Sequence, residues 1–214
     1  MSSLSAVIFL SYLLGSVSFA IVVSRLRGLA DPRSYGSGNP GATNMLRSGD
    51  KAAAALTLIG DAAKGLLAVV IVRLLFLPAA VSVDEAQLWL AAGAGAVFLG
   101  HLYPVFFRFQ GGKGVATALG ALLGLSPLLG LLVLLVWLLV FGITRISSLS
   151  ALAAAVSAPI LAALPWAGFF QTPVWWAVLL MSLLLLLRHR SNIRDLLSGK
   201  ERPVSPSDSE KPPC

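Results

Sequence analysis

Residues 4–24 read LSAVIFLSYLLGSVSFAIVVS and carry no charged side chain. At ~1.5 Å per residue, a helix of this length is about long enough to cross ~30 Å of bilayer hydrocarbon. A cleaved signal peptide would carry basic residues before its apolar core, and none precede this run, so we expect an uncleaved membrane span. Arg25, Arg27 and Arg33 follow it, which by the positive-inside rule places this end in the cytoplasm and the N-terminus outside.

The composition of the whole chain indicates the same class of protein. Of 214 residues, 57% are hydrophobic and 12% are charged, whereas a soluble chain carries about a quarter charged residues. The net charge of +7 would suit nucleic acid, but a nucleic-acid-binding protein needs a basic soluble face, so we expect no nucleic-acid partner. The single cysteine, Cys214, excludes an internal disulfide framework.

Six further apolar segments follow the first, and charged residues and prolines bound them. They are residues 52–77, 86–107, 115–125, 128–144, 148–164 and 174–187. The stretch 115–144 is long enough for one span, but Pro127 breaks a helix, and a pair of helices returns Arg145 to the cytoplasmic side. The first helix of that pair would be only ~15 Å long, so whether it fully crosses the membrane stays open.

These segments predict an all-α fold, a polytopic integral membrane protein built as a seven-helix bundle, with the N-terminus outside and the C-terminus cytoplasmic. We expect residues 1–200 to form one membrane-embedded domain and residues 201–214 to form a disordered cytoplasmic tail. Arg73 then falls on the outer half, where its side chain extends toward the outer interface. Asp61 and Lys64, three residues apart on one helix face, predict an ion pair that lowers the cost of burying both charges.

The first of two glycine-rich polar loops lies at a predicted cytoplasmic end. It contains Ser37, Gly38, Asn39, Gly41, Thr43, Asn44 and Arg47. Its glycines match G-x-G-x-x-G, but a dinucleotide site needs a preceding strand, and a membrane helix precedes this loop. Glycine backbone N–H groups followed by a helix N-terminus suit an anion, and Arg47 adds a guanidinium for phosphate oxygens. An ordinary turn is the alternative.

The second polar loop occupies residues 100–117. It contains His101, Gly111, Gly112, Lys113 and Gly114. It is not a Walker A loop, because Phe107 stands where the first glycine belongs. Three glycines around a lysine still form an anion nest, and a basic loop that only fixes topology is the alternative. Later loops add Ser148, His189 and Asn192 to the same face, so we infer one anion site at the cytoplasmic interface.

Four motifs carry a family resemblance. They are SGNPGATNMLR (residues 37–47), DAAKG (61–65), GHLYPVFF followed by GGKGVAT (100–117) and RHRSN (188–192). In this order and spacing the chain resembles the PlsY-type acyl-phosphate:glycerol-3-phosphate acyltransferases of bacterial phospholipid synthesis, over nearly its whole length. The resemblance implies transfer of a fatty acyl group from acyl phosphate to the 1-hydroxyl of glycerol 3-phosphate, which gives 1-acylglycerol 3-phosphate (lysophosphatidic acid) and phosphate.

The resemblance also implies a setting and partners for the protein. It implies a multi-pass protein of the bacterial inner membrane with its active site facing the cytoplasm, and it requires no cofactor and no metal ion. The expected partners are acyl phosphate, glycerol 3-phosphate and the lipid bilayer, with other enzymes of phospholipid synthesis as further candidates. Without the resemblance, a small-anion transporter is the alternative, because intramembrane Asp61 and Lys64 and broken helices also suit a translocation path.

Residue roles follow from the resemblance alone. It implies catalytic roles for Ser37, Arg47, Lys113, His189 and Asn192, and substrate-binding roles for Gly38, Asn39, Gly41, Thr43, Asn44, His101, Gly111, Gly112, Gly114 and Ser148. The first loop would hold the acyl phosphate and the second loop glycerol 3-phosphate. Which hydroxyl acts among Ser147, Ser148 and Ser150 stays open. Because acyl phosphate is already activated, we expect a substrate phosphate, rather than His189 or His101, to take the hydroxyl proton.

Overall fold

The structure is a computed structural model that describes residues 3–77, 82–201 and 203–204. All regular secondary structure in these ranges is helical, which confirms the all-α prediction. The α-helices are α1 (Ser3–Gly15), α2 (Phe19–Leu26), α3 (Ala42–Met45), α4 (Lys51–Ile71), α5 (Val83–Leu102), α6 (Val115–Leu125), α7 (Pro127–Thr144), α8 (Ser147–Ala162), α9 (Pro173–Arg188) and α10 (Arg190–Leu197).

The predicted number of seven helices is wrong, because the described ranges contain ten α-helices. The first predicted span is broken at residues 16–18, so that α1 and α2 meet at a bend of 41°. The short helix α3 forms inside the first polar loop, and α10 follows α9 after a bend of 59° at His189. Each additional helix lies outside the long apolar runs or at a break within one, where hydropathy carries little information.

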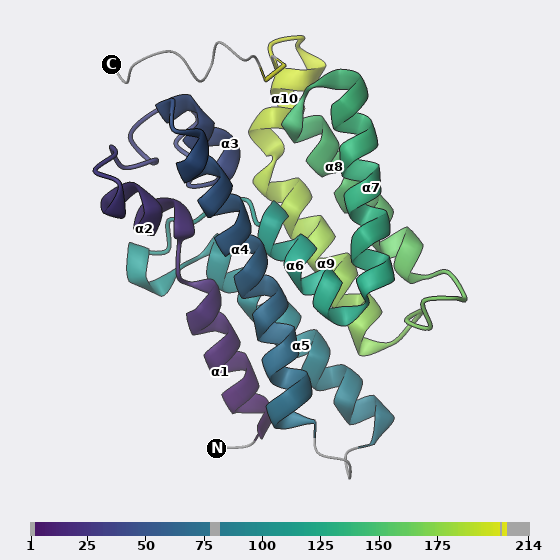
Figure 1. The fold of residues 1–214 in the computed structure, drawn as a ribbon. Coiled ribbons are helices and arrows are strands. Elements are labelled where there is room, and N and C mark those ends of the chain that lie inside the picture. The colour runs from purple at the N-terminus through teal and green to yellow at the C-terminus, as the bar shows by residue number, and fades with distance from the viewer. Residues whose placement is uncertain (1–2, 78–81, 202, 205–214) are drawn as a thin grey trace.

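Within the described residues, three helical stretches are long and apolar enough to cross a membrane, namely Lys51–Phe76, Val83–Phe107 and Pro127–Thr144. The number rises to five if each of the bent pairs α1–α2 and α9–α10 counts as one span. Helices α6 and α8 are apolar but shorter. Helix α6 lies in the middle of the bundle, where it contacts α4, α5, α7 and α9 (Figure 1).

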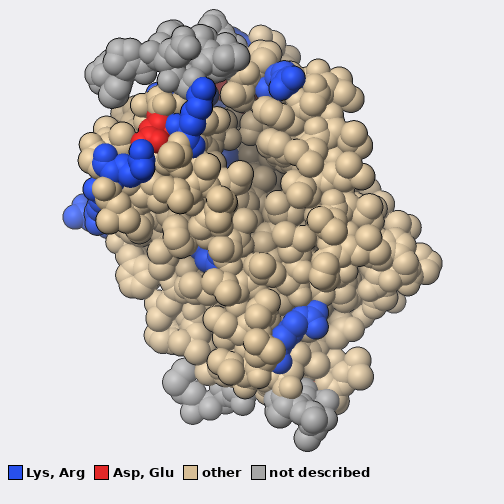
Figure 2. All heavy atoms as spheres, viewed as in Figure 1, with Lys and Arg blue, Asp and Glu red and all other residues tan. Residues whose placement is uncertain are grey.

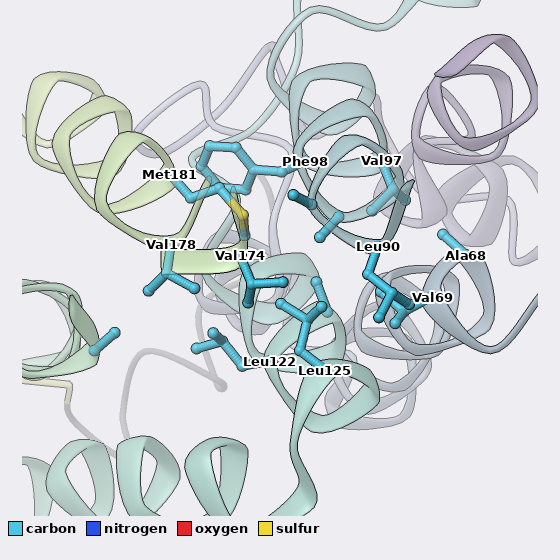
Figure 3. Close-up of a cluster of buried hydrophobic side chains, with 14 of the residues drawn as sticks. Ala68, Val69, Leu90, Val97, Phe98, Leu122, Leu125, Val174, Val178 and Met181 are labelled. Carbon is cyan, nitrogen blue, oxygen red and sulfur yellow. The ribbon is translucent and has the colours of Figure 1, made fainter. Parts of the chain in front are cut away.

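Glycines let α6 approach α4 closely. A Cβ atom added at Gly65 of α4 would lie 2.2 Å from the carbonyl oxygen of Thr117, and one added at Gly120 of α6 would lie 1.9 Å from that of Ala62. Small residues at such crossings allow backbone-to-backbone contact between membrane helices. The core beside this crossing is apolar and draws side chains from α4, α5, α6 and α9 (Figure 3).

Asp61 and Lys64 of α4, and Arg73 of its C-terminal extension, each have a polar partner. The predicted ion pair is confirmed, since Lys64 Nζ lies 2.8 Å from Asp61 Oδ1. Lys64 also donates a hydrogen bond of 2.7 Å to the carbonyl of Val17, in the break between α1 and α2. Arg73, which the sequence places on the outer half, is exposed and donates to the carbonyls of Gly124 and Leu125 at 3.1 and 2.7 Å, where it caps the end of α6.

The two ends of the bundle differ in charge. Helix α1 begins at the end opposite α3 and α10 (Figure 1). Most of the Lys and Arg atoms visible on one face lie at the end with α2, α3 and α10, and the middle of that face is almost free of charged residues (Figure 2). Of the predicted tail 201–214, Arg202 and residues 205–214 lie outside the described residues. Val204 N donates to the Arg145 carbonyl at 2.9 Å, and Glu201 accepts a hydrogen bond from the side chain of Asn192.

Candidate active site

A cavity of about 540 Å³ lies between the first polar loop, α4, α6, α7, α8 and α9. Figure 2 shows the face hollowed below the end where the basic residues gather. One end of the cavity is polar and is lined by Ser37, Asn39, Gly41, Thr43, Asn44, Arg47, His101, Lys113, Gly114, Ser147, Ser148, His189, Asn192 and Glu201. The remaining lining is apolar apart from Asp61 and Ser182. One space therefore joins a basic, hydroxyl-rich end to a slot suited to hydrocarbon.

The structure brings together most of the residues singled out from the sequence. Twelve of the fifteen line the cavity, and Gly38, Gly111 and Gly112 are the three that do not do so among the described residues. Gly111 and Gly112 lie directly before Lys113 in the second loop, and Gly38 adjoins Ser37 and Asn39 in the first. The predicted roles of all fifteen stay predictions, but their convergence from four separate segments is observed.

Asn44 organises the first loop. Its side-chain oxygen accepts hydrogen bonds from the backbone N–H of Ser37 at 3.0 Å and from Arg47 Nη1 at 3.4 Å. Its amide nitrogen donates to the carbonyls of Pro32 and Tyr35 at 2.7 and 3.2 Å. Since Asn44 is buried while Ser37 and Arg47 are exposed, this amide shapes the loop and leaves those two side chains facing the cavity.

The first loop and α8 meet across the mouth of the cavity. The hydroxyl oxygens of Thr43 and Ser147 lie 3.1 Å apart, which joins α3 to the first turn of α8. Ser148 also lines the cavity, whereas Ser150 is fully buried and donates to the Ile146 carbonyl at 2.9 Å. Of the three serines left open from the sequence, Ser147 and Ser148 are therefore the ones with access to a ligand.

The second loop is packed against the end of α5. The backbone N–H of Gly112 donates to the carbonyl of His101 at 3.1 Å. Arg188 of α9 closes the loop from the other side, because its guanidinium donates to the Gly111 carbonyl at 2.9 Å and to the Gly112 carbonyl at 3.1 and 3.2 Å. The same guanidinium lies 5.5 Å from the ring centre of Tyr103. These contacts fix the peptide groups that precede Lys113.

Lys113 connects the second loop to the C-terminal segment. Its ammonium donates to Asn192 Oδ1 at 2.5 Å, and Asn192 Nδ2 donates to Glu201 Oε1 at 2.8 Å. The hydroxyl of Ser148 donates to the same carboxylate oxygen of Glu201. Burial lowers the pKa of Lys113 below that of an ordinary lysine, and Arg188 lowers it further, while Glu201 acts in the opposite direction.

The two histidines are held in different ways. His189 Nδ1 lies 2.9 Å from the Leu185 carbonyl, which only accepts, so Nδ1 donates and Nε2 of the neutral ring is left as an acceptor. His101 Nδ1 lies 3.2 Å from the Thr117 hydroxyl and 3.5 Å from Asp61 Oδ1. The buried ion pair of α4 thus extends to the polar end of the cavity through His101.

A family model described as "Glycerol-3-phosphate acyltransferase" matches residues 5–199. The chain belongs to the glycerol-3-phosphate acyltransferase family. It is 61% identical over 191 residues to the glycerol-3-phosphate acyltransferase of Burkholderia lata, which covers 89% of this chain and 86% of that protein. It is also 61% identical over 191 residues to the one from Burkholderia pseudomallei, with coverage of 89% and 90%. The predicted family membership is confirmed.

Solved structures of the same family are similar in fold. The crystal structure of PlsY, an integral membrane glycerol 3-phosphate acyltransferase, in its glycerol 3-phosphate form has a TM-score of 0.85 at 37% identity and covers 95% of this chain and 96% of that one. The lysophosphatidic acid form has a TM-score of 0.83 at 35% identity, with coverage of 98% and 99%. This acyltransferase is therefore a membrane protein built on the same helical fold.

Two residues of the acyltransferase site were not singled out as site residues from the sequence. Arg188 belongs to the RHRSN motif, but basic residues are common at any cytoplasmic helix end. The sequence therefore did not indicate that Arg188 contacts the second loop. Glu201 follows a glycine and a lysine in a polar stretch with no apolar pattern. Only the folded chain brings Glu201 beside Asn192 and Ser148.

Proposed function

We propose that this chain transfers a fatty acyl group from acyl phosphate to the 1-hydroxyl of glycerol 3-phosphate, giving 1-acylglycerol 3-phosphate and inorganic phosphate. The observation that carries the proposal is the single cavity that joins a basic, glycine-lined end to an apolar slot. Its two halves match a phosphate ester and a hydrocarbon chain. The related PlsY structures in glycerol 3-phosphate and lysophosphatidic acid forms support the same acceptor and product.

In the proposed reaction, the two polar loops each hold one phosphate. The second loop, held in place by Arg188 and carrying the half-buried cation Lys113, holds the phosphate of glycerol 3-phosphate. The first loop, whose exposed Arg47 and Ser37 face the cavity, holds the acyl phosphate with its chain in the apolar slot. This assignment places the reacting carbonyl between the loops, at the boundary of the polar and apolar halves.

The chemical step requires positioning more than activation, because phosphate is already a good leaving group. The 1-hydroxyl attacks the acyl carbonyl, the tetrahedral oxyanion collapses, and the C–O bond to phosphate breaks. A substrate phosphate takes the hydroxyl proton. His189, whose Nε2 is left as an acceptor, orients the hydroxyl, and N–H and O–H donors of the first loop stabilise the oxyanion.

The proposed setting is the bacterial inner membrane, with the active site facing the cytoplasm, the N-terminus outside and the C-terminus inside. The gathering of Lys and Arg at the end of the bundle that holds the site supports this orientation, because cytoplasmic ends carry the excess of basic residues. We propose one membrane-embedded domain over residues 1–200, followed by a cytoplasmic tail. We propose other enzymes of phospholipid synthesis as partners only because they share substrates with this protein.

Release of inorganic phosphate by the purified protein in detergent tests the proposal. With synthetic palmitoyl phosphate and glycerol 3-phosphate together, we expect phosphate release and formation of lysophosphatidic acid. Omission of glycerol 3-phosphate should abolish lysophosphatidic acid formation. Transfer from acyl-CoA but not from acyl phosphate would overturn the proposed donor. Uptake of phosphate esters into proteoliposomes without acyl transfer would instead support the transporter alternative.

A further inference from the structure

The apolar slot ends at a common depth on four helices. The deepest residues that line it are Leu122 of α6, Val133 of α7, Ala158 of α8 and Val178 of α9. One turn further along each helix are Leu125, Leu129, Ala162 and Val174, which are 3% exposed or less and do not line the cavity among the described residues. Figure 3 shows Leu125 and Val174 gathered with Leu122 and Val178 between α6 and α9. The slot therefore has a closed floor.

Two helices give the same distance from the polar end of the cavity to the floor. On α8, the lining runs from Ser148 to Ala158, ten residues or ~15 Å along the helix axis. On α9 and its cap, it runs from His189 to Val178, eleven residues or ~16 Å. An extended chain of single bonds advances ~1.2 Å per bond, since three backbone bonds span at most ~3.6 Å. An acyl chain whose carbonyl carbon lies level with Ser148 and His189, where the reaction is proposed to occur, therefore has room for about 14 carbons in extended form above the floor.

The wall formed by α8 owes its space to small side chains. The residues of α8 that face the slot beyond the serines are Ala151, Ala154, Ala155 and Ala158. On the opposite side of the same helix, Val156 and Ile160 are more than half exposed. A larger side chain at Ala158 would occupy the space directly above the floor, whereas one at position 156 would point away from the slot.

We propose that this floor limits the length of acyl chain that the site can bury, and that Ala158 is the specificity-determining position. The proposal rests on the proposed function, because the slot must hold the acyl chain of the donor. Each methylene buried in the slot adds about fourfold to binding, up to the length that reaches the floor. Longer chains bend or leave part of the chain in lipid and gain nothing further.

A series of acyl phosphates with 8 to 18 carbons tests the proposal in one detergent. For the unmodified protein, kcat/KM should rise with chain length to about 14 carbons and then level off. Ala158→Leu should lower the ratio of the 14-carbon to the 10-carbon rate at least tenfold, because the added side chain fills the last part of the slot. Val156→Leu, which places the same side chain on the exposed side of α8, should leave that ratio unchanged.

A second variant acts in the opposite direction. Leu125→Ala removes part of the floor and should raise the ratio of the 16-carbon to the 14-carbon rate. A rate that keeps rising through 18 carbons, or an Ala158→Leu variant that loses all chain lengths equally while Leu125→Ala leaves the ratio unchanged, would overturn the proposal. Absence of turnover with every acyl phosphate in the folded, unmodified protein would instead contradict the proposed function, so the two failures are distinguishable.

Discussion

The first glycine loop lies at the surface, whereas the second is packed inside the molecule. Gly36, Ser37 and Gly38 are exposed, and one buried amide, that of Asn44, holds their loop together. Gly111 and Gly112 are buried between the end of α5 and α9. The first loop, whose stabilising contacts come from its own residues, can adjust to its ligand. The second loop, which packs against two neighbouring helices, forms a rigid binding site.

The largest effect should come from the cation of the second loop. Lys113→Met keeps most of the length of the side chain but removes a half-buried charge that hydrogen-bonds to Asn192. We expect kcat/KM for glycerol 3-phosphate to fall about 100-fold or more, which corresponds to ~3 kcal/mol. Phosphate release under limiting glycerol 3-phosphate measures it. Arg190→Met, at an exposed position of α10, is the control, and a loss of similar size there would contradict the assignment.

The two loops should respond differently to an added methyl group. In Gly111→Ala the new Cβ would lie 2.1 Å from the carbonyl oxygen of His101, so backbone must shift, and we expect KM for glycerol 3-phosphate to rise about 30-fold. In Gly38→Ala the nearest atom is 3.5 Å away, and only the positive φ of 65° opposes the change, at about 1 kcal/mol or fivefold. Equal effects on KM and on thermal stability would show that both loops are equally rigid.

Arg188 should matter through the second loop rather than through the chemistry. Arg188→Gln removes a guanidinium that donates to the Gly111 and Gly112 carbonyls, so the second loop becomes less rigid. We expect about a tenfold rise in KM for glycerol 3-phosphate, with kcat changed less than threefold. Arg190→Gln serves as the matched control on the exposed side. A fall in kcat at unchanged KM would place Arg188 in the chemical step instead.

The smallest effect concerns pH. The pKa of Lys113 is lowered by burial, so its cation is lost as the pH rises through a value below that of an ordinary lysine, and kcat/KM should fall there. Glu201→Gln removes the carboxylate that raises this pKa, and the alkaline fall should therefore move to lower pH. The pH profile of kcat/KM in the two proteins measures the shift. An unchanged profile would mean that another group controls the alkaline limb.

The long helices could be predicted from the sequence because charges and prolines bound apolar runs. The segment 52–77 corresponds closely to the helical stretch Lys51–Phe76, which begins with α4, and the segment 128–144 corresponds to α7. The break between α1 and α2 could not be predicted, because the segment has no proline and Gly15, which directly precedes the break, is of a type that membrane helices commonly contain. Its free carbonyl at Val17 is satisfied by Lys64, which is distant in sequence. Only the folded chain reveals that partner.

The polar end of the site could be predicted in outline, because the positive-inside rule places the glycine loops on one face before any contact is known. The apolar slot and its floor could not. They depend on the relative register of α6, α7, α8 and α9, which no single segment encodes. Ala158 appears in the sequence as one of many alanines, and only its position above Ala162 and opposite Val178 gives it a place in the cavity.

The capping of α6 by Arg73 has a consequence at the far end of that helix. Gly114, the residue before α6, lies next to Lys113 at the polar end of the cavity, while Arg73 compensates the carbonyls at the other end. A helix dipole has two ends, and a cation at the C-terminal one leaves the partial positive charge of the N-terminus facing the anion site. A guanidinium on the opposite side of the bundle thus helps to set the electrostatic potential that a phosphate meets on arrival.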